Sequence, residues 1–123
     1  MIDADDLERE LRQYYLTVAQ AKLEALSAAL AEARQRPSEA SSIEQLRFVV
    51  HKIAGSAGSY GFEALGSSAK AVEKEIRAAR GPLPAHVLLA AERFLVCMAA
   101  EFAAAREQER ARVCGEAAAG EGG

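Results

Sequence analysis

The chain has 123 residues, of which 50% are apolar but only 6% aromatic, and its formal net charge at pH 7 is −3. This length suits one domain with one core, and the acidic balance excludes a nucleic-acid binder that relies on a broad basic patch. No apolar run approaches the roughly 20 residues that span a bilayer. The first ten residues, MIDADDLERE, contain no apolar signal segment. We therefore expect a cytoplasmic protein without membrane or nucleic-acid partners.

Apolar residues recur every three or four positions in four segments, which predicts four helices. The first segment covers about residues 5–35, and its apolar stripe rotates near Val18. The rotation indicates either a bend or a short helix followed by a longer one. Pro37 and the serines that follow it end this segment.

The second predicted helix begins near Ser41, which forms a capping box with Glu44. Gly61 is placed to cap its C-terminal end. The third follows at once and ends at Gly81, and the fourth runs from about residue 84 to residue 106. We expect the second helix to turn these residues toward the core: Ile43, Leu46, Val49, Val50, Ile53, Ala57 and Tyr60.

Short connections between the four stripes predict an all-α fold, an antiparallel up-down four-helix bundle with an N-terminal helical extension. Residues 1–112 form the bundle, and residues 113–123, which end in AAAGEGG, form a disordered, flexible tail. All four stripes can be used inside one bundle, so we expect a monomer. Cys97 lies in an apolar run and is expected to be a buried free thiol. Neither Cys97 nor Cys114 has the neighbours of a zinc site, and we expect no metal.

The stretch HKIAGSAGSYG, residues 51–61, places three glycines after a histidine in a helical pattern. Glycine inside a helix costs about 1 kcal/mol relative to alanine. On a helix of 3.6 residues per turn, His51 lies opposite the core stripe with Glu44, Arg47, Phe48, Gly55 and Gly58. One interpretation is a bare docking strip beside the imidazole. The alternative is that the glycines contact a neighbouring helix and His51 is an ordinary surface residue.

The run HKIAGSAGSYGF followed by EALGSSAKAVEKEI resembles the histidine-phosphotransfer (HPt) domain family. The family pattern is a histidine, two residues, usually a lysine, then a glycine, small residues and a glycine, with a further glycine before an apolar residue. In this chain His51, Gly55, Gly58, Gly61 and Phe62 occupy the matching positions. The resemblance covers roughly residues 43–77 in detail and the whole chain in helix layout.

The resemblance implies that His51 accepts a phosphoryl group and passes it to or from the aspartate of a receiver domain. The implied partners are receiver domains of response regulators or hybrid histidine kinases, with Mg²⁺ on the receiver and no cofactor on this chain. The docking surface would comprise Arg47, Phe48, Ala54, Gly55 and Gly58. The protein would be a carrier without kinase activity of its own.

One position departs from the family pattern, because Ala54 stands where the lysine is usual. Lys52 and Lys70 are candidates to support the phosphoryl charge in its place. Glu73 lies where some relatives place a polar residue that orients the imidazole, and its alternative role is a solvated surface charge. The second hypothesis for function is a helical interaction module that docks a receiver or kinase domain without transferring phosphate. A general-base enzyme lacks a partner carboxylate or nucleophile at suitable spacing.

Overall fold

The computed structural model describes the backbone of residues 3–121 and the side chains of residues 3–116. Four α-helices follow one another along the chain: α1 (Ala4–Gln35), α2 (Ala40–Ser56), α3 (Glu63–Ala78) and α4 (Ala85–Glu121). A short 3₁₀ turn, η1 (Gly58–Tyr60), joins α2 to α3. The predicted all-α fold is confirmed.

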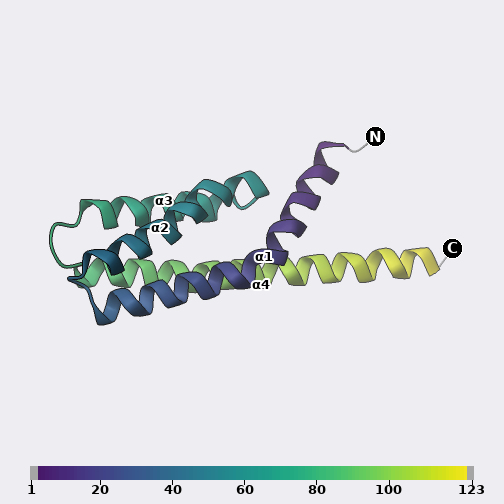
Figure 1. Ribbon diagram of the computed structural model, residues 1–123. Helices are drawn as coiled ribbons and strands as arrows, with labels where there is room; N and C mark the ends of the chain where they lie inside the picture. The colour runs from purple at the N-terminus through teal and green to yellow at the C-terminus, as the bar shows by residue number, and fades with distance from the viewer. Residues whose placement is uncertain (1–2, 122–123) are drawn as a thin grey trace.

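The helices pack as a ring in chain order, and Figure 1 shows α2 and α3 lying together over α1 and α4. In the described part of the chain, α1 packs on α2, α2 on α3, α3 on α4 and α4 on α1, and the backbones of the diagonal pairs, α1 with α3 and α2 with α4, do not come close. The backbone N–H of Leu83 also donates to the Pro37 carbonyl at 2.9 Å, which joins the α3–α4 connection to the α1–α2 connection. This arrangement is the expected up-down bundle.

The core fills the centre of the ring with large apolar side chains. Tyr15, Phe62 and Phe102 form an aromatic cluster, with ring centroids of Phe62 and Phe102 5.4 Å apart and nearly perpendicular. Edge-to-face packing of this kind is favourable beyond the area that it buries. The other large, fully buried side chains come from all four helices: Leu26, Leu46, Val50, Ile53, Leu65, Val87 and Met98.

Helix α1 is continuous but bent, and its N-terminal turns leave the line of the bundle (Figure 1). Asp3 caps its first turn by accepting a hydrogen bond from the Asp6 N–H at 2.9 Å. The Thr17 hydroxyl donates to the Tyr14 carbonyl at 2.6 Å, a back-bond of the type that bends helices. The bend confirms the first of the two alternatives that the rotated stripe left open.

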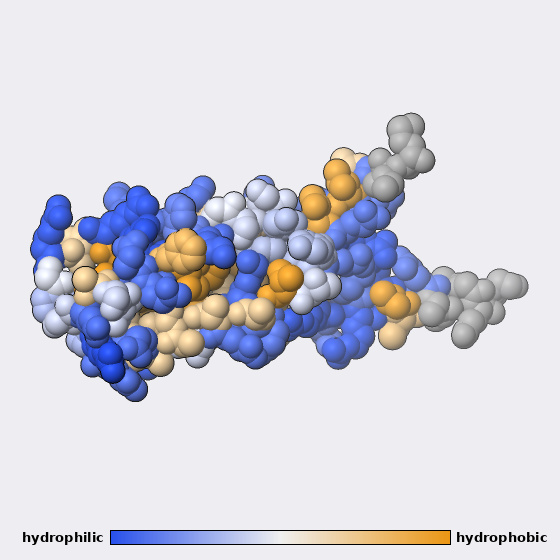
Figure 2. Space-filling model, viewed as in Figure 1, coloured by the Kyte–Doolittle hydropathy of each residue, from blue (hydrophilic) through white to orange (hydrophobic). Residues whose placement is uncertain are grey.

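Helix α4 extends beyond its neighbours as helix to Glu121. Helical structure therefore continues past residue 112. Two ion pairs connect this extension to the bent turns of α1: Arg9 lies 3.9 Å from Glu109 and 3.7 Å from Glu116. Figure 2 shows exposed apolar residues on both projecting parts, where Leu7 and Val113 are exposed. The flexibility of residues 113–123 stays a prediction.

Two local predictions were wrong. Helix α2 begins at Ala40, one residue before Ser41, and its N-cap residue Glu39 makes no side-chain capping bond, so the capping box does not form. Glu44 instead pairs with Arg47. Cys97 is exposed, because it lies about 100° around α4 from the buried Met98. No helix in the described part of the chain is long and apolar enough to cross a membrane.

Candidate functional site

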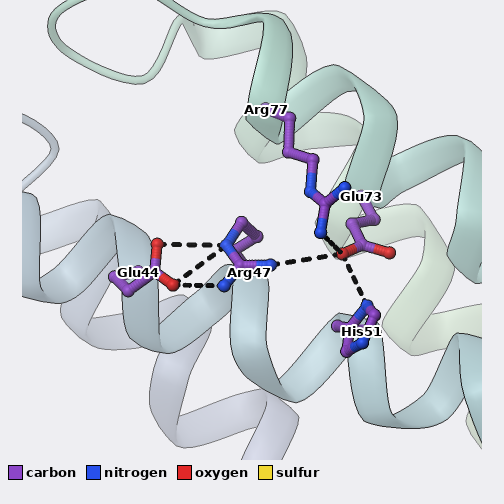
Figure 3. A network of polar contacts seen from close by, with 5 residues as sticks. All are labelled: Glu44, Arg47, His51, Glu73 and Arg77. Carbon is purple, nitrogen blue, oxygen red and sulfur yellow. Dashed lines mark hydrogen bonds and ion pairs between the residues drawn. The ribbon is translucent and has the colours of Figure 1, made fainter.

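The candidate site lies between α2 and α3, where an exposed histidine meets a buried carboxylate. The side chain of His51 on α2 is 55% exposed, whereas that of Glu73 on α3 is 10% exposed. The Nδ1 atom of His51 lies 2.8 Å from Oε2 of Glu73 (Figure 3). Glu73 is therefore not a solvated surface charge, and its carboxylate directs the imidazole.

Two arginines share the same carboxylate oxygen with the imidazole. Arg47 Nη1 lies 3.4 Å from Glu73 Oε2, and Arg77 Nη2 lies 3.0 Å from it (Figure 3). Guanidinium groups can only donate, so this carboxylate oxygen is the acceptor in both contacts. The Nδ1 atom of His51 must therefore be the donor, which assigns its hydrogen to Nδ1 and leaves the lone pair on Nε2.

Arg47 is held from its other side by Glu44, which lies three residues earlier on α2. Both carboxylate oxygens of Glu44 accept from Arg47 Nε at 3.0 Å. These hydrogen bonds lower the pKa of Glu44 and raise the pKa of Arg47. Two successive ion pairs therefore connect Glu44 and Arg47 on α2 with Glu73 on α3.

The surface of α2 beyond His51 is bare. A Cβ atom built at Gly55 or at Gly58 would have nothing within 4 Å, so the space over both glycines is open. The Phe48 side chain one turn before His51 is exposed. The prediction that these two glycines form an open strip is confirmed, although α2 ends at Ser56 and Gly58 already belongs to η1.

Gly61 has a different task, because it ends the 3₁₀ turn with φ of 89°, in the left-handed region that favours glycine. A Cβ at this position would also meet Arg12 Cγ at 2.6 Å. The prediction that Gly61 caps the second helix was wrong, because α2 ends at Ser56 with Ala57 as its C-cap residue and Gly61 caps η1 instead. The three glycines of the stretch therefore have different roles. Gly55 and Gly58 leave an open surface, whereas Gly61 adopts the left-handed conformation that ends the 3₁₀ turn.

The prediction that Ala54 belongs to the exposed docking surface was wrong, because Ala54 is only 8% exposed. It faces α3, where it lines a hollow with Gly58, Gly66 and Lys70. Gly66 lets the two backbones come close, since a Cβ on it would lie 3.2 Å from the Gly58 nitrogen. Ala54 thus belongs to the contact between α2 and α3 rather than to the open strip.

The two candidate lysines lie on opposite sides of α2. Lys52 lines the α1 side, and its ammonium group lies 5.4 Å from the centre of the Phe48 ring. Lys70, on α3, lines the hollow beside Ala54. Of the two, Lys70 is therefore the one that shares the α2–α3 side with Glu73.

A second contact fixes the end of α2 against α1. The Ser56 hydroxyl donates to the Lys52 carbonyl at 2.8 Å, and the Tyr15 hydroxyl lies 2.9 Å from the same Ser56 oxygen. Burial raises the pKa of Tyr15, and the bond to Ser56 partly offsets this effect.

Sequence reasoning missed the role of Arg77 at this site and took Arg47 for a surface residue. The spacing from Glu73 to Arg77 is four residues, which places the pair on one helix face and is a signal that could have identified it. The contact between Arg47 and Glu73 could not be identified in the same way, because it depends on how α2 packs on α3. Among the side chains of residues 3–116, no group of three or more histidine, cysteine or acidic residues could hold a metal ion.

A four-helix bundle that holds an exposed imidazole against a buried carboxylate has the architecture of a histidine-phosphotransfer module. The family model of the Hpt domain matches residues 10–112, most of the chain. The chain therefore belongs to the Hpt domain family, whose members are histidine-phosphotransfer modules of phosphorelays. Searches among curated proteins and among solved structures found no match.

Proposed function

We propose that Nε2 of His51 accepts a phosphoryl group and relays it to or from the aspartates of receiver domains in a two-component phosphorelay. The observation that carries this proposal is the 2.8 Å contact between His51 Nδ1 and Glu73 Oε2. It leaves Nε2 as the nucleophilic atom, and the open surface over Gly55 and Gly58 gives a partner domain access to it.

Transfer from a receiver is a balanced exchange of one bond for another. The lone pair on Nε2 attacks the phosphorus of the aspartyl phosphate, the N–P bond forms while the O–P bond breaks, and the aspartate leaves as a carboxylate. Such a transfer depends on in-line positioning and charge neutralisation. The phosphorylated ring, which keeps its hydrogen on Nδ1, is positively charged, and Glu73 balances that charge.

The reverse reaction uses the same atoms, so the chain can pass phosphate in either direction. In this proposal the aspartate and its Mg²⁺ belong to the receiver partner, and the chain is a phosphocarrier without kinase activity. Lys70, rather than Lys52, supports the phosphoryl charge, because Lys70 lines the hollow where the family's usual lysine is replaced by Ala54. We propose that the chain acts as a cytoplasmic monomer.

Phosphotransfer profiling tests the proposal. Receiver domains and hybrid kinases from the source organism are phosphorylated with labelled phosphate, mixed with this protein, and followed for transfer of acid-labile label. We expect label within seconds in the wild type, none in His51→Gln, and wild-type labelling in His86→Gln, which removes the other histidine of the chain.

The same experiment distinguishes the non-transferring docking module. If no donor labels the folded protein, while a receiver still binds both the wild type and His51→Gln, the carrier proposal is wrong. Ala54 is the observation that favours this second candidate, because the family's usual lysine is absent there.

A further inference from the structure

A groove between α1 and α2 is lined by Lys52, which follows His51 in the chain, and has no role in the chemistry described above. It has a volume of about 350 Å³. Its apolar lining includes Val18, Ala21, Phe48 and Val49, and its charged lining is Lys22 from α1 and Lys52 from α2. We call it the lysine groove. Figure 2 shows apolar surface over α1 and α2 with hydrophilic residues around it.

The groove is positively charged in a chain whose net charge is −3. No carboxylate lines it. Within residues 3–116, neither Lys22 nor Lys52 takes part in an ion pair. Their ammonium groups lie instead over aromatic rings, Lys22 over Tyr15 at 5.1 Å and Lys52 over Phe48 at 5.4 Å.

Lys22 is unfavourably placed in the isolated protein. Burial lowers its pKa, and the neighbouring charge of Lys52 lowers it further. No carboxylate lines the groove to compensate the partly buried ammonium group of Lys22. Residues that lower the stability of a fold without any structural benefit are often retained because they contribute to binding.

The groove continues the open surface beside His51. Positions 48, 52 and 55 share a face of α2, because they are spaced by four and three residues. That face is exposed at Phe48, Lys52 and Gly55. A partner that lies over the bare Gly55 to reach Nε2 of His51 would therefore extend across Phe48 to the groove.

We propose that the lysine groove determines receiver specificity by taking an apolar side chain of the receiver, flanked by a carboxylate that pairs with Lys22 and Lys52. The proposal rests on the proposed function, since it needs a receiver over His51. Charge complementarity identifies the occupant, because two unpaired ammonium groups at the rim of an apolar groove select an acidic, apolar segment.

The test measures receiver binding and transfer in charge variants of the groove. Lys22→Glu and Lys52→Glu reverse each charge, and Arg93→Glu is a matched control on α4, which contributes no residue to the groove. With the receiver found by profiling, we expect each groove variant to weaken binding about 10-fold or more, with loss of salt dependence, and the control to bind as the wild type. Lys22→Met and Lys52→Met, which only remove charge, should show smaller losses in the same direction.

A second step identifies the partner's group. Replacing acidic residues of the receiver one at a time by lysine should yield one variant that binds Lys52→Glu better than it binds the wild type. Each protein's helical circular dichroism shows that it remains folded.

Three results overturn the proposal. One is unchanged binding in all four groove variants while His51 is still phosphorylated, which refutes the groove and leaves the carrier function intact. Another is sedimentation showing that the wild type self-associates and that Lys22→Glu abolishes this, which makes a second copy the occupant. The third is that no donor labels His51, in which case the proposed function fails first.

Discussion

His51 and Glu73 lie 22 positions apart in the chain, yet their side chains meet with 2.8 Å between Nδ1 and Oε2. The contact joins an exposed residue of α2 to a buried residue of α3. It assigns the hydrogen of the imidazole to Nδ1 and leaves the lone pair on Nε2, the atom that we propose accepts the phosphoryl group. The space over Gly55, one turn after the histidine, is open.

Glu73→Gln should slow phosphorylation of His51 by roughly 10- to 100-fold, the loss typical of carboxylates that orient imidazoles in metal sites. The amide can still occupy the space, but it cannot balance the positive ring of the phosphorylated histidine. Stopped-flow transfer from a labelled receiver measures the rate. A rate equal to the wild type, in a variant of unchanged fold, would show that Glu73 does not act on the histidine.

Arg77→Ala should change the tautomer of His51 without preventing folding, because the Arg77 side chain is 57% exposed. Without this guanidinium, Glu73 is held only by Arg47 at 3.4 Å and can turn away from the ring. Nitrogen-15 NMR of labelled histidine measures the share of hydrogen on Nδ1, which we expect to fall. Arg80→Ala, near the end of the same helix, serves as a control and should leave the histidine spectrum unchanged.

Gly55→Ala and Gly55→Leu should separate helix stability from docking. The space over Gly55 is open, so Ala fits and should stabilise the helix by about 0.5–1 kcal/mol, less near its end. Leu fits the isolated protein equally well but should obstruct the receiver. Urea unfolding and receiver titration measure the two effects. If Gly55→Leu binds and accepts phosphate normally, the open strip is not the docking surface.

Gly61→Ala should destabilise the bundle, in contrast to Gly55→Ala. Its φ of 89° costs a residue with a Cβ about 1–2 kcal/mol, and the added atom would also displace Arg12. We expect a lower urea midpoint with an unchanged slope. Equal stability of the two alanine variants would contradict the assignment of Gly61 as a left-handed cap.

Glu44 should contribute stability at neutral pH and lose that contribution in acid. Its pKa in the folded state is lowered from 4.5 by Arg47, so the folded protein binds the proton less readily than the unfolded chain does. The contribution is therefore complete above pH 4.5 and is lost as pH falls through the lowered value. Wild type and Glu44→Gln should differ in unfolding free energy at pH 6 and converge near pH 2. A difference that persists at the lower pH would contradict the ion pair.

The sequence alone determined the helices, the bundle and the open side of α2. Apolar spacing of three and four residues is a local property, and helix geometry places Gly55 and Phe48 on the face of His51 without reference to other helices. Membership of the family was likewise visible in residues 51–62, which are contiguous. Breaks at Gly61 and Gly81 were readable because glycine tolerates positive φ.

Only the tertiary structure decided which side chains meet. The rotation of α2 against α3 buries Ala54 and brings Arg47 to Glu73, and a sequence pattern does not specify that rotation. Long side chains such as Lys52 can reach either flank of their helix, so their final contacts depend on neighbouring elements. Local periodicity thus predicts which face of a helix is exposed, whereas the packing of whole helices determines the hydrogen bond between His51 and Glu73 that leaves the lone pair of the imidazole on Nε2.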